Sequence, residues 1–208
     1  MLQITNIKNY IKNNKFIFFG VITLYFLGFL IGSVYSNFID DTAFLSSYDT
    51  TKDFLKSLMI SEQALNLKEL IVSEITPACM IAICGIMLLG LPVVLYLIFK
   101  SGFSLGFYIT FLIKAFSLKG LYLGMFYLFL NLIVVLPAIT LISANSIEFN
   151  LYILACVNKK YAVQRNFAVS VVIYVFILIL CLLLLALSAN LKFGLLPAVV
   201  KFLFSSVL

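Results

Sequence analysis

The chain has 208 residues, of which 64% are hydrophobic and 11% are charged, and its mean hydropathy is +1.18. A water-soluble domain is nearer half apolar and a quarter charged, so this composition excludes a soluble globule. It also excludes a disordered chain, which needs low hydrophobicity and high charge. Because the apolar stretches are continuous rather than alternating, a β-barrel is not expected either. The composition predicts an all-α, polytopic helical membrane protein with about five transmembrane helices, or six if a short one forms near the end.

The net charge of +6 comes from 14 basic and 8 acidic residues. Most lysines flank apolar runs, where positive charge sets membrane topology, so no nucleic-acid partner is expected. Histidine is absent and no two cysteines form a CxxC motif, so neither a metal site nor a disulfide framework is predicted. We interpret the four cysteines as small apolar residues: Cys79, Cys84, Cys156 and Cys181. No cofactor is expected.

The first predicted span covers residues 16–36, which contain no charge and are long enough to cross a bilayer. Lys8, Lys12 and Lys15 precede it, so residues 1–15 are expected in the cytoplasm. No cleavage site of the A-x-A type follows, and we interpret the run as an uncleaved first span.

Residues 37–76 form the one long polar stretch and are predicted to be an extracellular loop. Within it, Thr50 and Asp53 have the spacing of a helix start. Two readings of this helix stay open: it rests on the membrane domain of the same chain, or it presents a docking face for an extracellular partner. The apolar residues that would share its face are Phe54, Leu55, Leu58, Leu65 and Val72.

Residues 77–189 are predicted to be a multi-span membrane domain, and residues 190–208 a tail that lies on the outer surface or makes a short span. Thr76 and Pro77 resemble a helix cap and first helical position. The tail is interrupted by Lys192 and Pro197. The apolar runs of the domain are 77–99, 102–116, 121–143 and 167–189.

The run 102–116 is short for a span and contains Lys114, so it either crosses thinly or re-enters. If it crosses, Lys159, Lys160 and Arg165 fall on the cytoplasmic side with the N-terminus. The positive-inside rule therefore favours crossing. This gives five spans, with the N-terminus inside and the C-terminus outside.

Glycines recur four residues apart, a spacing that places them on one helix face and lets helix backbones approach closely. The pattern predicts helix packing within this chain or packing against a partner's transmembrane helix. Asn131 within a span could bond to another helix, and Pro137 predicts a kink. The glycines concerned are Gly28, Gly32, Gly102, Gly106, Gly120 and Gly124.

The sequence offers few groups for catalysis. No ionisable residue is expected at the centre of a span, where such residues are functional candidates. No histidine is available for a catalytic triad, and Gly102-x-x-x-Gly106 is not followed by the Lys-Ser of a phosphate loop. We therefore expect a protein that is not an enzyme and has no catalytic residues.

The order of short motifs in residues 89–138 resembles the stage II sporulation protein M family. So do the charged N-terminus, the single span, the outer loop and the multi-span remainder. The motifs, in order, are Gly90-Leu91-Pro92, Phe99-Lys100-Ser101-Gly102, Gly106-Phe107, Lys119-Gly120, Asn131 and Leu136-Pro137-Ala138.

The resemblance implies a non-enzymatic scaffold in the cell membrane, on the mother-cell side of the sporulation septum in a Gram-positive spore-former. It implies that the scaffold recruits and localises peptidoglycan-degrading enzymes during septal membrane migration and engulfment, with stage II sporulation proteins D and P as partners and membrane lipid around it. Relatives carry further polar residues near Asn131 and a Glu before a late Pro, where this chain has Asn190 and Lys192 before Pro197.

The departures at these positions count against a transport role but leave the scaffold reading intact. The alternative is a small permease or channel, which would need a hydrated cavity lined by polar side chains such as Asn131, Ser143 and Asn145.

Overall fold

The computed structural model describes residues 15–60, 66–87, 90–157 and 167–204, with side chains for all of these except 59–60, 155–157 and 167–168. Every regular element in these ranges is helical, which confirms the predicted all-α membrane fold. The elements in chain order are α2 (Lys15–Tyr35), η1 (Ser36–Phe38), α3 (Asp41–Ile60), α4 (Leu67–Ile86), α5 (Gly90–Leu130), η3 (Asn131–Val135), α6 (Leu136–Val157) and α7 (Phe167–Phe204).

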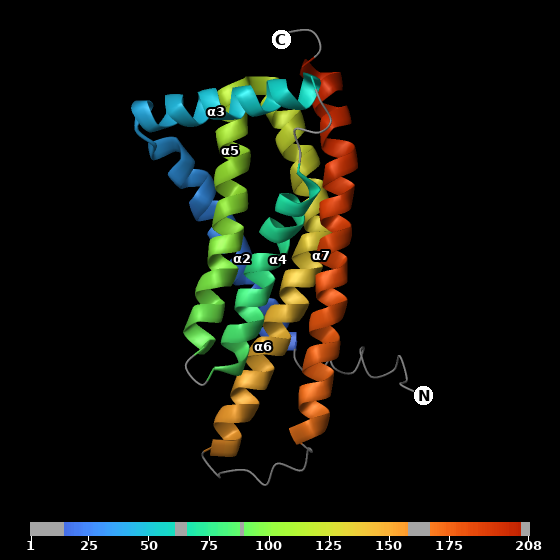
Figure 1. Cartoon of the computed structure of the whole chain (residues 1–208). Coiled ribbons are helices and arrows are strands. Elements are labelled where there is room, and N and C mark those ends of the chain that lie inside the picture. Colours follow the sequence, from blue (N-terminus) through green and yellow to red (C-terminus); the bar gives the residue numbers. More distant parts are fainter. Residues whose placement is uncertain (1–14, 61–65, 88–89, 158–166, 205–208) are drawn as a thin grey trace.

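Helix α5 folds back on itself at Ser117. This residue has φ 50° and ψ −126°, which no helix adopts, and it is the one non-glycine with positive φ in the described part of the chain. The rings of Tyr108 and Tyr127, on either side of the bend, lie 5.3 Å apart. Residues 90–116 and 118–130 are therefore antiparallel arms, and Figure 1 shows the second arm continuing through η3 into α6.

The fold-back turns four long apolar helices into five passes through the bundle. The third of these helices, Gly90–Leu154, contains the bend and passes twice. Its first arm, residues 90–116, would measure about 40 Å at 1.5 Å per residue, more than the ~30 Å of a bilayer core. Residues 102–116 were predicted to cross the membrane rather than re-enter it, and an arm of this length agrees with that prediction.

The predicted span 77–99 is wrong, because the chain turns within it. Helix α4 ends at Ile86, Met87 N–H donates to the Cys84 carbonyl at 3.1 Å, and Gly90 N–H donates to the Met87 carbonyl at 2.9 Å. A Cβ at Gly90 would overlap the Cys84 carbonyl, so the turn requires glycine. Apolar residues continue through this turn, and hydropathy alone does not reveal it.

The predicted outer loop is also too long, and the predicted tail is part of a helix. Helix α4 begins at Leu67, with the Asn66 side chain capping Lys68 N–H at 3.2 Å, so residues 67–76 belong to the bundle. Pro77 lies inside α4 rather than at its first position. Helix α7 runs without a break to Phe204, past Pro197, so residues 190–204 are neither a surface helix nor a separate span. The predicted cytoplasmic residues 1–14 and the last four residues lie outside the described ranges.

Helix α3 lies across one end of the bundle, which we call the α3 end (Figure 1). It begins at Asp41, so the predicted start at Thr50 is wrong; the Thr50 hydroxyl bonds to the Ser46 carbonyl within the helix, at 2.8 Å. One face packs on the membrane domain: Leu55 and Leu58 are buried against Leu112, Leu123, Val200 and Phe204. The rings of Phe44 and Phe111, and those of Tyr48 and Phe116, are 5.5 Å apart in each case.

This packing corrects the docking-face reading for Leu55 and Leu58, which face the bundle of their own chain. Phe54 remains 40% exposed at the edge of α3, and Val72 is 61% exposed but lies on α4. Leu65 lies outside the described residues. The prediction treated residues 54–72 as one helix, whereas they belong to two helices, α3 and α4. Its apolar residues therefore do not share one face.

Helix α2 packs closely along the first arm of α5 through glycines. A Cβ at Gly28 or Gly32 would overlap the backbone of Phe99 or Phe103, and one at Gly102 or Gly106 would overlap the carbonyls of Tyr25 or Phe29. Four of the predicted glycines therefore bring backbones of the same chain together. Gly120 meets the Leu112 carbonyl across the bend of α5, and Gly124 lies against the side chain of Ile109.

We expect Gly28→Ala to lower the thermal unfolding temperature of the full chain in detergent, because the added methyl must displace the Phe99 carbonyl. Overpacking of this kind costs about 1–3 kcal/mol. Gly20→Ala, in the same helix, is the matched control: no atom lies within 4 Å of its Cβ position, so its stability should be unchanged or slightly raised. Equal unfolding temperatures for the two variants would contradict the close packing.

Candidate functional site

An ion pair between Glu74 and Lys192 is buried inside the bundle. The side chains of Glu74, on α4, and Lys192, on α7, are 10% and 2% exposed. The Lys192 ammonium donates to Glu74 Oε1 and to Asn131 Oδ1, the latter at 3.1 Å. It also lies 4.7 Å from the centre of the Tyr127 ring, a cation–π contact. We call Glu74, Tyr127, Asn131 and Lys192 the Lys192 cluster.

The local backbone positions Asn131 for this contact. Asn131 begins the π-helix η3, in which Leu136 N–H donates to the Asn131 carbonyl, five residues back. The Asn131 side-chain amide donates to the Tyr127 carbonyl at 2.8 Å, so its Oδ1 is left to accept from Lys192. Single π-turns of this type often mark functional sites within helices. Pro137 follows on α6, where it cannot donate a helical hydrogen bond.

The Lys192 cluster corrects the expectation that no ionisable residue lies deep in a span. Lys192 was assigned to a tail because it interrupts the apolar stretch there, and Glu74 to an outer loop because it belongs to the long polar stretch before the span predicted at Pro77. Both are instead inside long helices, and each neutralises the other. The sequence signal that could have found them is a lone lysine in a helical apolar stretch, which is a functional candidate by default.

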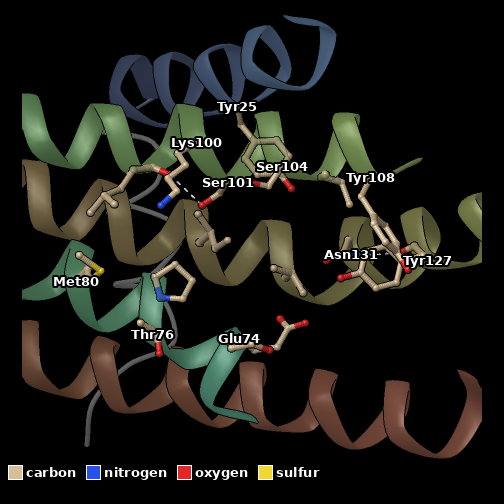
Figure 2. Close-up of a pocket in the computed structure, with 16 residues that line it drawn as sticks. Tyr25, Glu74, Thr76, Met80, Lys100, Ser101, Ser104, Tyr108, Tyr127 and Asn131 are labelled. Carbon is tan, nitrogen blue, oxygen red and sulfur yellow. Dashed lines mark hydrogen bonds between the residues drawn. The ribbon is translucent and has the colours of Figure 1, made fainter. Parts of the chain in front are cut away.

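A cavity of about 660 Å³ lies beside the Lys192 cluster. It is walled by α2, α4, both arms of α5, η3 and α6, with Lys100 toward one end and Tyr108, Tyr127 and Asn131 toward the other (Figure 2). Its apolar walls include Leu97, Leu105 and Ile139, all buried. The polar residues that line it are Tyr25, Ser73, Glu74, Thr76, Lys100, Ser101, Ser104, Tyr108, Tyr127 and Asn131.

A second polar layer joins α4, α6 and α7 toward the end of the bundle that is opposite the α3 end. The Tyr174 hydroxyl donates to the Ala82 carbonyl at 2.6 Å and lies 3.1 Å from Ser146 Oγ. Asn145 donates to the Tyr174 carbonyl at 3.3 Å, and Asn150 donates to the Met87 carbonyl. Asn145 is therefore used for helix packing, and neither Ser143 nor Asn145 lines the cavity. Of the three polar residues expected around a hydrated path, the cavity contains Asn131.

Among the cysteines whose side chains the structure describes, none makes a hydrogen bond in the Lys192 cluster or in the second polar layer. Cys79, Cys84 and Cys181 have free thiols, and the side chain of Cys156 lies outside the described residues. Within the described ranges, no three of the side chains that could bind a metal come together.

The model of the family described as "Stage II sporulation protein M" matches residues 16–189, which is most of the chain.

The chain belongs to the stage II sporulation protein M family.

The matched range covers α2 to α6 and the first part of α7, including the hairpin of α5 and three of the four residues of the Lys192 cluster. Lys192 itself follows the matched range. No curated protein and no solved structure matches the chain. Membership in this family gives the chain a role in sporulation, and its helices make it a membrane protein.

Proposed function

We propose that this stage II sporulation protein M family member is a non-enzymatic scaffold of the cell membrane that recruits and localises peptidoglycan-degrading enzymes. In this role it acts during septal membrane migration and engulfment, on the mother-cell side of the septum, with stage II sporulation proteins D and P as partners. The observation that supports this most is the family match over residues 16–189.

The geometry of the ionisable residues agrees with a holding role. Lys192 bonds to both Glu74 and Asn131, so the two opposite charges neutralise each other and join α4, η3 and α7. A catalytic acid or base instead needs to reach a proton of the substrate. The chemistry of wall degradation would then belong to the partners.

Helix α3 provides the surface on which such partners would act. With the N-terminus inside, as the positive-inside rule predicts, α3 lies on the extracellular side. Its inner face, with Leu55 and Leu58, is buried on the bundle, which holds the helix in place. Its outer face carries Asp49, Asp53 and Lys56, all exposed and within two helical turns. An extracellular partner with basic groups would find the two carboxylates there, on a helix held in place by its buried face.

We expect the double variant Asp49→Lys with Asp53→Lys to lose co-purification with proteins D and P from sporulating cells, and to stall engulfment. Reversing two charges repels a basic partner while leaving the buried face of α3 unchanged. Co-purification, measured by quantitative mass spectrometry, should fall about tenfold or more. The matched control is Asp40→Lys with Asp41→Lys, which makes the same change of charge at the start of the helix.

Retention of both enzymes by the Asp49/Asp53 variant would contradict the proposed surface. Equal loss in the control would assign the effect to net charge rather than to this face of α3.

The cavity supports a second candidate, a small permease or channel. A hollow of about 660 Å³ lies between six helical segments and is lined by an amide, a carboxylate and several hydroxyl groups, as a substrate path between membrane helices would be. Asn131 would be the polar residue on the path.

For this candidate, we expect purified protein in liposomes to let a small polar solute pass, and Asn131→Leu to abolish that flux. Thr140→Val, on α6 and outside the cavity lining, is the control and should keep it. Absence of flux above protein-free liposomes would remove the permease as a candidate.

A further inference from the structure

Three donor groups form a stripe along one wall of the cavity. Lys100, Ser104 and Tyr108 are each four residues apart on the first arm of α5, so they share a helix face, and all three are exposed. The described contacts give none of their side-chain polar atoms a hydrogen-bond or ion-pair partner. We call Lys100, Ser104 and Tyr108 the donor stripe.

The opposite wall has little capacity to donate. The hydroxyls of Ser73 and Thr76 on α4 donate to the carbonyls of Leu70 and Val72, at 2.8 and 2.6 Å. On the same arm as the donor stripe, the Ser101 hydroxyl donates to the Leu97 carbonyl at 2.9 Å. The hydroxyls of Ser73, Thr76 and Ser101 are thus satisfied within their own helices, and Tyr25 and Tyr127 are not exposed, so a ligand would take its hydrogen bonds from the exposed donor stripe.

The depth of Lys100 makes its charge costly. It is ten residues from the start of α5, so it lies about 15 Å along an arm about 40 Å long, within the apolar layer of a bilayer. A lysine at bilayer depth costs up to ~3 kcal/mol when it is not paired. At the far end of the cavity Glu74 is already neutralised by Lys192, so Lys100 leaves the cavity with one uncompensated positive charge.

The cavity opens on the flank of the bundle rather than at either end. The residues at its rim, Thr76, Met80 and Ser104, are exposed, and apolar side chains such as Ile83 and Tyr96 are exposed beside it. Figure 2 shows Thr76 and Met80 on α4 and Lys100 and Ser101 on α5, on opposite sides of the cavity. A ligand would therefore enter from the bilayer and would need an apolar part that stays there.

We propose that this cavity binds the phosphate headgroup of an anionic phospholipid, with the phosphate on the donor stripe and the acyl chains along the exposed flank of α4 and α5. An ammonium and two hydroxyls supply charge-assisted hydrogen bonds to phosphate oxygens. The cavity volume lies in the range of small-ligand sites, which is ~300–1,000 Å³. This site is separate from the α3 surface, and its occupancy does not depend on the proposed partners.

The test is a titration of the full chain, purified in a neutral phosphate-free detergent, with phosphatidylglycerol that carries a fluorescent acyl chain. We expect saturable binding that Lys100→Gln weakens about tenfold or more, because a hydrogen bond to a charged group is lost. Lys100→Arg should retain binding. Ser104→Phe should abolish it by filling the cavity, which keeps the test decisive if Lys100→Gln unfolds. Lys114→Gln is the matched control: that ammonium lies 4.9 Å from the Phe44 ring and outside the cavity, and binding should be unchanged.

Two further arms identify the source of the phosphate. Diacylglycerol with the same acyl chains should bind at least about tenfold more weakly, since it has no phosphate. Millimolar inorganic phosphate should not displace the lipid. Equal binding of diacylglycerol, or unchanged binding by both Lys100→Gln and Ser104→Phe, would overturn the proposal. Displacement by inorganic phosphate would assign the site to the free ion and overturn the lipid assignment.

Discussion

A buried charge in a membrane bundle must have a partner, and the arrangement of α4, η3 and α7 follows from that requirement. Lys192 is almost fully buried, and its ammonium reaches the Glu74 carboxylate, the Asn131 amide oxygen and the face of the Tyr127 ring. Removal of one partner from such a set leaves a charge that neither water nor lipid can solvate. The cluster therefore determines how α7 is placed against α4 and the π-turn, and three of its residues, Glu74, Tyr127 and Asn131, line the cavity.

The remaining helices are held by close packing rather than by charge. Glycines allow α2 to lie against the first arm of α5, where van der Waals contact replaces the hydrophobic effect that is missing within lipid. Helix α3 then covers one end of the bundle with its buried face. The result is a body with two exposed carboxylates, Asp49 and Asp53, at the α3 end and a polar cavity that opens on its flank. A scaffold needs such a rigid surface for partners, and a lipid site would place it in a membrane of suitable composition.

The all-α membrane fold could be predicted from the sequence because hydropathy and the length of the apolar runs decide it. The close-packed glycines were visible through their spacing, although spacing alone could not say which helix they would meet. The end of α4 at Ile86 and the start of α5 at Gly90 could not be predicted. The apolar run 77–99 continues through the turn at Met87, and hydropathy does not reveal a turn made of apolar residues. The Lys192 cluster was missed because its members are 118 and 61 residues apart in sequence, and each taken alone looks like the end of a span. The donor stripe could not be found because one predicted apolar run ended at residue 99 and the next began at 102. In the structure, Lys100, Ser104 and Tyr108 belong to one helix, α5.

The pairing of Glu74 with Lys192 holds the bundle together, and the charge-swapped variant Glu74→Lys with Lys192→Glu tests this most directly. Its free energy of unfolding in detergent would be compared with those of the two single variants. Each single change puts two like charges together in a buried site and should cost about 3–5 kcal/mol or more. The swap restores opposite charges, and Asn131 can turn its amide group to donate to the new carboxylate. We expect the double variant to recover most of the lost free energy of unfolding. A double variant that is as unstable as the sum of the two single changes would contradict it.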